Sequence, residues 1–169
     1  MLKGLAKFIL GDRRDFEAFQ VEVSTYSSLE CQICPQAVFA EKWIFQNMPL
    51  ETFQRISPHF PRTRWVSFRG WGDPLENENL PEMLRLAKQA ECGTALTTNG
   101  FLLTEEFSRW LLQADPDLVV VALELATQAV QRALLQTGSD FRRILDQVEV
   151  LVKMRNASGK KKPAVKLSF

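Results

Sequence analysis

The chain has 169 residues, of which 46% are hydrophobic and 24% charged, and its formal net charge is +1. This length fits one domain with a sizeable hydrophobic core. The balanced charge and ordinary composition argue against disorder and against strong non-specific binding to nucleic acid. No apolar run reaches the roughly 20 residues of a membrane span, so we expect neither a nucleic-acid nor a membrane partner.

Residues 1–18 are predicted to form an N-terminal helical extension, followed by the main domain at 19–169. A signal peptide is not expected, because no small-residue cleavage site follows the first apolar residues. Two of the three cysteines form a C-x-x-C pair, which argues against a disulfide framework and predicts a reducing, cytoplasmic location. The apolar residues of the extension recur at helical spacing, at Leu2, Leu5, Phe8 and Ile9.

Apolar strand patterns alternate with helical patterns along the rest of the chain. Strands are expected at 19–25, 65–69, 94–98, 118–123 and 164–169. Helices are expected at 49–56, 80–89, 104–113 and 140–155, with Gly93 ending the second of them. This order predicts an α/β fold with a parallel sheet and right-handed crossovers. It leaves two architectures open, a doubly wound sheet and a fragment of a barrel.

Candidate functional residues directly follow three of the predicted strands. Cys31 and Cys34 follow the first, the Gly70–Pro74 segment follows the second, and Asn99 follows the third. Because carboxyl ends of parallel strands meet at one edge of a sheet, we expect these residues to lie together. Cys92 precedes the third strand, so we expect it at the opposite end as a buried structural thiol.

The C-x-x-C pair has several interpretations when it is taken without its context. A structural zinc site needs four ligands, and Cys92 and the single His59 are too few to complete one. A thiol-redox site is an alternative, because the pair follows a first strand, although the expected fold is larger than that of such proteins. A third interpretation is that the two cysteines are incidental. Pro35 and the loops downstream argue against it.

Ser27, Cys31 and Cys34 together resemble the C-x3-C-x2-C loop of the radical S-adenosylmethionine (SAM) family, with Ser27 at the first cysteine position. In that family the loop cysteines hold a [4Fe–4S] cluster. The resemblance implies that Cys31 and Cys34 are metal ligands and that Ser27 occupies the remaining ligand position. Thiolates are soft ligands that suit iron–sulfur clusters, whereas a serine hydroxyl is a poor iron ligand near neutral pH.

The downstream loops resemble the SAM-binding segments of the same family. The segment Gly70–Pro74 is similar to the G-x-G-E-P motif, whose backbone carbonyls receive the amino group of SAM, and glycines allow that approach. Ile33 matches a residue near the adenine, and Asn99 lies in a segment similar to the family's third-strand TNG. The resemblance therefore implies cofactor-binding roles for Ile33, Gly70, Trp71, Gly72, Asp73 and Asn99.

Other positions depart from the family pattern. Ala122 stands where a fourth-strand serine helps to hold SAM, and Leu125 and Leu135 stand where a glycine and an arginine are common. The sequence stops at the fifth strand of what the resemblance implies is an incomplete (β/α)6 partial TIM-type barrel. We therefore expect the strand at 164–169 to form an unprotected sheet edge, and the chain to be truncated.

The resemblance implies [4Fe–4S]-dependent reductive cleavage of SAM, which starts radical chemistry on a peptide or small-molecule substrate. The cofactor supplies the difficult step in such a reaction, and the electron donor would be a ferredoxin or flavodoxin. The alternative is a catalytically degenerate or truncated relative that acts as a binding or accessory protein. The C-x-x-C pair and the Gly70–Pro74 segment favour the enzyme. The departures at Ser27, Ala122 and Leu125 favour the alternative.

Overall fold

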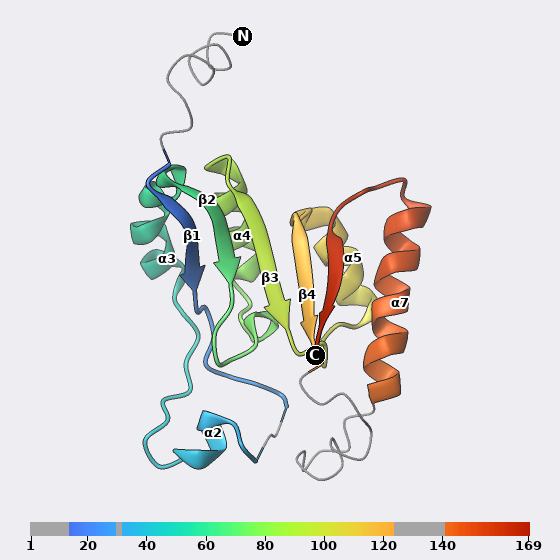
Figure 1. Ribbon diagram of the computed structural model, residues 1–169. Coiled ribbons are helices and arrows are strands. Elements are labelled where there is room, and N and C mark those ends of the chain that lie inside the picture. Colours follow the sequence, from blue (N-terminus) through green and yellow to red (C-terminus); the bar gives the residue numbers. More distant parts are fainter. Residues whose placement is uncertain (1–13, 30–31, 124–140) are drawn as a thin grey trace, which may run out of the picture.

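The computed structural model describes residues 14–29, 32–123 and 141–169. Its sheet consists of β1 (Phe16–Val21), β2 (Thr63–Phe68), β3 (Gly93–Thr98), β4 (Leu118–Ala122) and β5 (Ala164–Ser168). All neighbouring strands are parallel and lie in chain order, β1-β2-β3-β4-β5 (Figure 1). A doubly wound sheet reverses its strand order part-way, so this order identifies a part of a (β/α) barrel.

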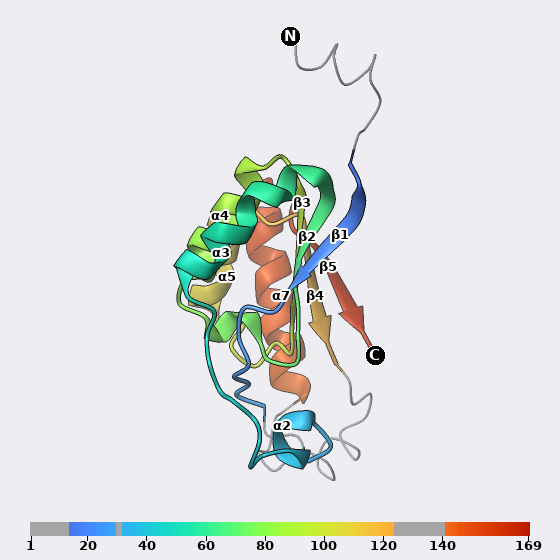
Figure 2. The same ribbon diagram turned by 90° about the vertical axis from the view of Figure 1, so that its left-hand side faces the viewer.

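The main helices cover one face of the sheet. They are α3 (Leu50–Ile56), α4 (Leu80–Gln89), α5 (Glu105–Ala114) and α7 (Phe141–Ala157), and Figure 2 shows them on the same side of the strands. Two 3-10 helices, η1 (Ser57–Arg62) and η2 (Pro74–Glu76), lie in connections. The short helix α2 (Pro35–Val38) lies beyond the carboxyl ends of the strands (Figure 1). The opposite sheet face carries no helix among the described residues.

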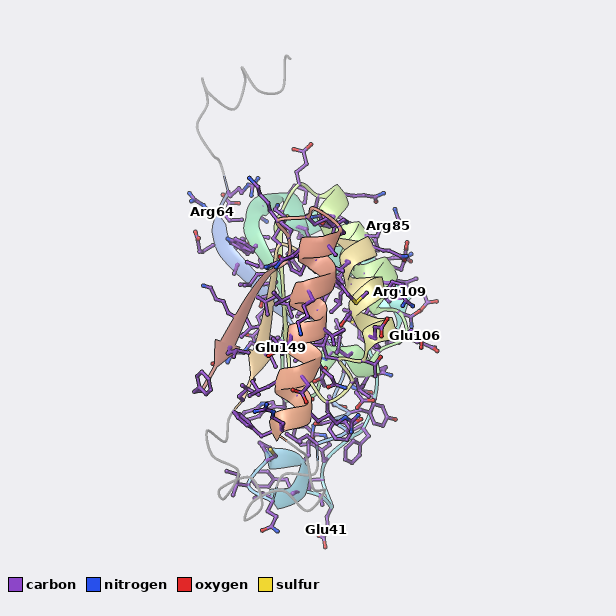
Figure 3. The ribbon with its side chains drawn as sticks, turned by 90° about the vertical axis from the view of Figure 1, so that its right-hand side faces the viewer. Glu41, Arg64, Arg85, Glu106, Arg109 and Glu149 are labelled. Carbon is purple, nitrogen blue, oxygen red and sulfur yellow. The ribbon has the colours of Figure 1, made fainter. Side chains whose placement is uncertain are left out.

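The hydrophobic core lies between the sheet and this helix layer. Side chains alternate along the strands, so that Leu96 and Val119 are buried against the helices while Ala95 and Val120 face the open side and are half-buried. Helix α4 buries the apolar face that its sequence period predicts, which comprises Leu80, Met83, Leu84 and Ala87. The outer helix faces carry charged side chains such as Arg85, Arg109 and Glu149 (Figure 3).

Three predicted boundaries were wrong, each for a physical reason. Strand β1 begins at Phe16, inside the predicted 1–18 extension, whose first 13 residues lie outside the described residues. It ends at Val21 because the next residues turn to pair elsewhere, with the amide of Met48 donating to the carbonyl of Val23 at 2.8 Å. Gly93 does not end α4 but opens β3, and the chain instead turns at Glu91, whose φ is 58°.

Strand β5 lies at one edge of the sheet, as expected, and pairs with β4 alone among the described strands. Leu167 and Phe169 are 39% and 75% exposed. No helix in the described part of the chain is long and apolar enough to cross a membrane.

Candidate functional site

The carboxyl ends of the strands open into one cavity of about 870 Å³. Parallel strands bring their following loops to this end, and residues distant in the chain therefore meet there. Cys31 lies outside the described residues, as do Leu125 and Leu135. The cavity is lined by all the other predicted site residues, which are Ser27, Ile33, Cys34, Gly70, Trp71, Gly72, Asp73 and Asn99.

Ser27 ties the loop after β1 to the end of β3. Its Oγ accepts hydrogen bonds from the amide of Leu29 at 3.2 Å and from Nδ2 of Asn99 at 3.3 Å. The hydroxyl oxygen at the first cysteine position of the motif is therefore already used by two protein donors.

The two described cysteines lie at opposite ends of the sheet. Cys34 is the half-buried residue preceding α2, and its carbonyl accepts from the amides of Ala37 and Val38 at 2.9 and 3.0 Å. Cys92 precedes β3 and is buried, with its Sγ donating to the carbonyl of Phe60 at 3.0 Å. Burial raises the pKa of the Cys92 thiol, which agrees with the predicted structural role.

Asp73 directs its carboxylate into the protein. Its Oδ1 accepts from the amide of Leu75 at 2.9 Å, and its Oδ2 accepts from the Thr98 hydroxyl at 2.7 Å and the Asn99 amide at 2.8 Å. The side chain is buried, and burial raises its pKa to about 6 although these donors favour the charged form. The carboxylate thus joins the loop after β2 to the end of β3.

Glu22 is a cavity residue that the sequence analysis missed. Its Oε1 accepts hydrogen bonds from the backbone amides of Trp71 at 2.5 Å and Gly72 at 3.3 Å. The signal was present in the alternation along β1, because Gln20 and Glu22 share the face opposite the buried Val21.

Gly70 and Gly72 are both required by close packing within the protein. A Cβ on Gly70 would lie 2.2 Å from Oε1 of Glu22, and a Cβ on Gly72 would lie 2.2 Å from the carbonyl oxygen of Ser24. The family resemblance explains these glycines by the approach of SAM. The structure supplies a separate reason, which is the approach of the loop after β1.

Gln36 connects α2 to the glycine loop, which we define as residues 70–73. Its Nε2 donates to the carbonyl of Thr25 at 3.0 Å and to that of Trp71 at 3.3 Å. The Trp71 backbone is therefore held on both sides, at its amide by Glu22 and at its carbonyl by Gln36.

Comparisons with known proteins agree with this topology. No family model matches the chain. A curated relative, the tungsten-containing aldehyde ferredoxin oxidoreductase cofactor-modifying protein of Pyrococcus furiosus, is 25% identical over 151 residues, which are 86% of this chain and 41% of the relative.

Three solved structures superpose well. BtrN in complex with AdoMet and 2-DOIA has a TM-score of 0.62 at 20% identity, over 90% of this chain and 56% of BtrN. Streptococcus suis SuiB bound to S-adenosylmethionine has a TM-score of 0.63 at 21% identity. HydG, a maturase of the [FeFe]-hydrogenase, has a TM-score of 0.68 at 12% identity. Both comparisons cover 98% of this chain and 37% of the other. This chain has the core fold of the radical SAM family. It spans about half, or less, of the length of these relatives.

The radical SAM fold places Ala122 at the cavity, in register with Ser168 of the neighbouring strand. The cavity volume lies within the roughly 300–1,000 Å³ of small-molecule sites, and the lining combines apolar residues such as Ile33 and Val120 with polar ones such as Asn99. Its size and chemistry therefore fit a ligand such as SAM.

The donor set does not fit a cluster held by three thiolates of this chain. Only three cysteines are present, and Cys92 lies at the opposite end of the sheet. Cys31 and Cys34 are therefore the only thiolates available to the loop, while the Ser27 oxygen accepts protein hydrogen bonds. Among the described residues, from which Cys31 is missing, no three His, Cys, Asp or Glu side chains gather into a metal site.

Proposed function

We propose that this chain binds SAM in the cavity at the carboxyl ends of its strands, as a radical SAM core without cluster-dependent catalysis of its own. The observation that carries the proposal is that Ser27, Ile33 and Cys34 line one cavity together with the glycine loop and Asn99. Two structures that share the fold support it, because BtrN is in complex with AdoMet and SuiB is bound to S-adenosylmethionine.

The chain's own groups would bind and orient the ligand. Backbone carbonyls of the glycine loop would accept from its ammonium group, and the side chain of Ile33 would contact the adenine. Asn99 holds the cysteine loop through Ser27, which keeps the two sides of the cavity in register. When bound, SAM supplies an activated sulfonium centre. The protein excludes water around it and fixes its orientation.

Cluster-dependent reductive cleavage is the second candidate function. It is favoured by Cys34, which lines the same cavity as the glycine loop. Cys31 and Cys34 would be the ligands in that case, and Ser27 or an external group would have to serve as the third. That function alone would need an electron donor such as a ferredoxin or flavodoxin, and a peptide or small-molecule substrate.

Calorimetric titration of the iron-free chain with SAM tests the first candidate. We expect measurable binding in the parent and about tenfold weaker binding in Gly72→Ala, because the new Cβ meets the Ser24 carbonyl and shifts the loop. Gly93→Ala is the matched control, since its Cβ would meet the ring of Trp65 at 2.7 Å, at the end of the sheet opposite the cavity. A parent chain that binds no SAM contradicts the proposal.

Anaerobic reconstitution with iron and sulfide separates the two candidates. We expect low iron and sulfide content per chain in the parent and higher content in Ser27→Cys, which restores a third thiolate. A visible band near roughly 400 nm would accompany the cluster. Full and equal occupancy of the parent would instead support the enzyme.

A further inference from the structure

Glu22 is a charged residue of the cavity that no motif in the sequence assigns. It lies directly after β1, yet its hydrogen bonds reach Trp71 and Gly72, 49 and 50 residues further along the chain. The space that a side chain on Gly70 would occupy is filled by the Glu22 carboxylate and its Cγ, at 2.2 and 2.4 Å from the Cβ position. The missing side chain at Gly70 and the carboxylate of Glu22 are thus complementary.

These bonds determine the direction of two consecutive peptide groups. In a trans peptide the N–H and C=O point in opposite directions, and the one cis peptide among the described residues is Lys162–Pro163. Because the amides of Trp71 and Gly72 point at Glu22, the carbonyls of Gly70 and Trp71 point away from it. The bond from Gln36 Nε2 to the Trp71 carbonyl, at 3.3 Å, agrees with this orientation.

The Glu22 carboxylate also contributes negative charge next to those carbonyls. It forms no ion pair with a lysine or arginine in the described part of the chain. Carbonyl oxygens and an adjacent carboxylate together form a favourable environment for an ammonium group. A carbonyl has two lone pairs, so the bond from Gln36 leaves the Trp71 oxygen able to accept a second donor.

We propose that Glu22 is a positioning residue that orients the carbonyls of Gly70 and Trp71 to receive the ammonium group of the ligand. The inference rests on the proposed function, in which the ligand is SAM. It adds that binding selectivity for the amino-acid part of the ligand depends on a residue outside the cysteine and glycine motifs.

The test compares three ligands with and without the ammonium group. SAM and S-adenosylhomocysteine carry it, whereas 5′-methylthioadenosine lacks the amino-acid part. In Glu22→Ala we expect about tenfold weaker binding of the first two and little change for the third. Glu22→Gln keeps an acceptor oxygen and loses the charge, so its affinities should fall between those of the parent and Glu22→Ala. The matched control is Glu17→Ala on β1, the strand that precedes Glu22, because the Glu17 side chain is 75% exposed.

Amide hydrogen exchange tests the orientation without any ligand. In Glu22→Ala the amides of Trp71 and Gly72 should exchange at least about tenfold faster than in the parent, whereas Glu17→Ala should leave them unchanged. Thermal unfolding of each variant establishes that it is folded, and Glu22→Gln serves where Glu22→Ala does not fold.

The outcomes distinguish this inference from the proposed function. A parent that binds none of the ligands contradicts the proposed function and the inference resting on it, even if the exchange rates change. A parent that binds SAM as tightly as its Glu22 variants overturns the inference alone. If Glu22→Gln weakens the binding of all three ligands equally, the inference is also overturned, because the effect is then not directed at the ammonium group.

Discussion

The two ends of the parallel sheet each hold an aspartate, and the surroundings of the two differ. Asp117 lies at the amino end, where it accepts from the amide of Thr94 at 2.8 Å and pairs with Lys162 and, at 3.7 Å, Lys88. Burial alone would raise its pKa, but the bond from Lys162, the Thr94 amide and the charge of Lys88 together lower the pKa. Asp73, at the carboxyl end, has only neutral donors, and burial raises its pKa to about 6.

This difference separates a structural end from a binding end. At the amino end, lysine side chains neutralise the negative charge of the aspartates. Through these ion pairs, Lys160 and Lys162 also attach the loop before β5 to the body of the sheet. At the carboxyl end neither Glu22 nor Asp73 forms an ion pair with a described lysine or arginine. Glu22 and Asp73 line the cavity together with Arg69, and the negative charge of the Glu22 carboxylate favours a nearby ammonium group such as that of the proposed ligand.

The largest expected effect comes from replacing the two aspartates by asparagine. At about pH 4, below the Asp73 pKa of about 6, Asp73→Asn should lower the free energy of unfolding by about 3 kcal/mol, because an amide nitrogen in place of one carboxyl oxygen cannot accept from the buried donors that bond there. Asp117→Asn should lower it by only about 1 kcal/mol, because the Lys162 side chain is 54% exposed and solvent screens that pair. Urea denaturation measures both, and equal losses would contradict the contrast between the two ends.

The same two residues should respond to pH in opposite directions. Asp73 has a higher pKa in the folded chain, about 6, than its ordinary value of 3.8, so the folded state binds its proton more tightly. Its contribution to stability is complete below pH 3.8 and is lost as the pH rises through about 6. The pKa of Asp117 is lowered, so its contribution is present above the unfolded pKa and is lost as the pH falls through the folded one.

Denaturation of the parent and of both variants between about pH 4 and 8 measures these contributions. The stability difference between the parent and Asp73→Asn should be up to about 3 kcal/mol greater at the low-pH end than at the high-pH end. The difference between the parent and Asp117→Asn should stay nearly constant over this range, because the contribution of Asp117 is lost only as the pH falls below the ordinary value of 3.8. A difference that is independent of pH for Asp73→Asn would show that its carboxyl has an ordinary pKa in the folded chain.

The parts of this fold that the sequence predicted are those governed by local periodicity. The buried face of α4 and the helix expected at 104–113, where the Thr104 hydroxyl accepts from the amide of Phe107, both depend on residues close in the chain. The parallel sheet followed from the alternation of strands and helices. The choice of a barrel over a doubly wound sheet required the resemblance, because both architectures use the same local patterns.

The parts of the site that the sequence could not predict depend on contacts between distant segments. The motif spacing placed Asp73 in a cofactor loop, but it did not show that its carboxylate bonds Thr98, 25 residues away. Glu22 belongs to no motif, and its role becomes visible only when β1 and β2 are paired. The sequence predicts a helix stop at Gly93. It does not show that the ring of Trp65 lies against this glycine, which is a contact between two strands.

The smallest contrast between the two ends is expected for two glycines, one at each end of the sheet. A Cβ on Gly70 would displace the Glu22 carboxylate from two amides, whereas a Cβ on Gly93, 2.7 Å from the ring of Trp65, would displace a side chain that is 36% exposed. We therefore expect Gly70→Ala to lower the free energy of unfolding by about 2 kcal/mol and Gly93→Ala by about 1 kcal/mol or less. Because the three heavy atoms nearest to the Gly70 Cβ all belong to the Glu22 side chain, Gly70→Ala should cost much less in a Glu22→Ala background. A double-mutant cycle by urea denaturation measures this coupling, and additive losses would show that Glu22 and Gly70 are not complementary.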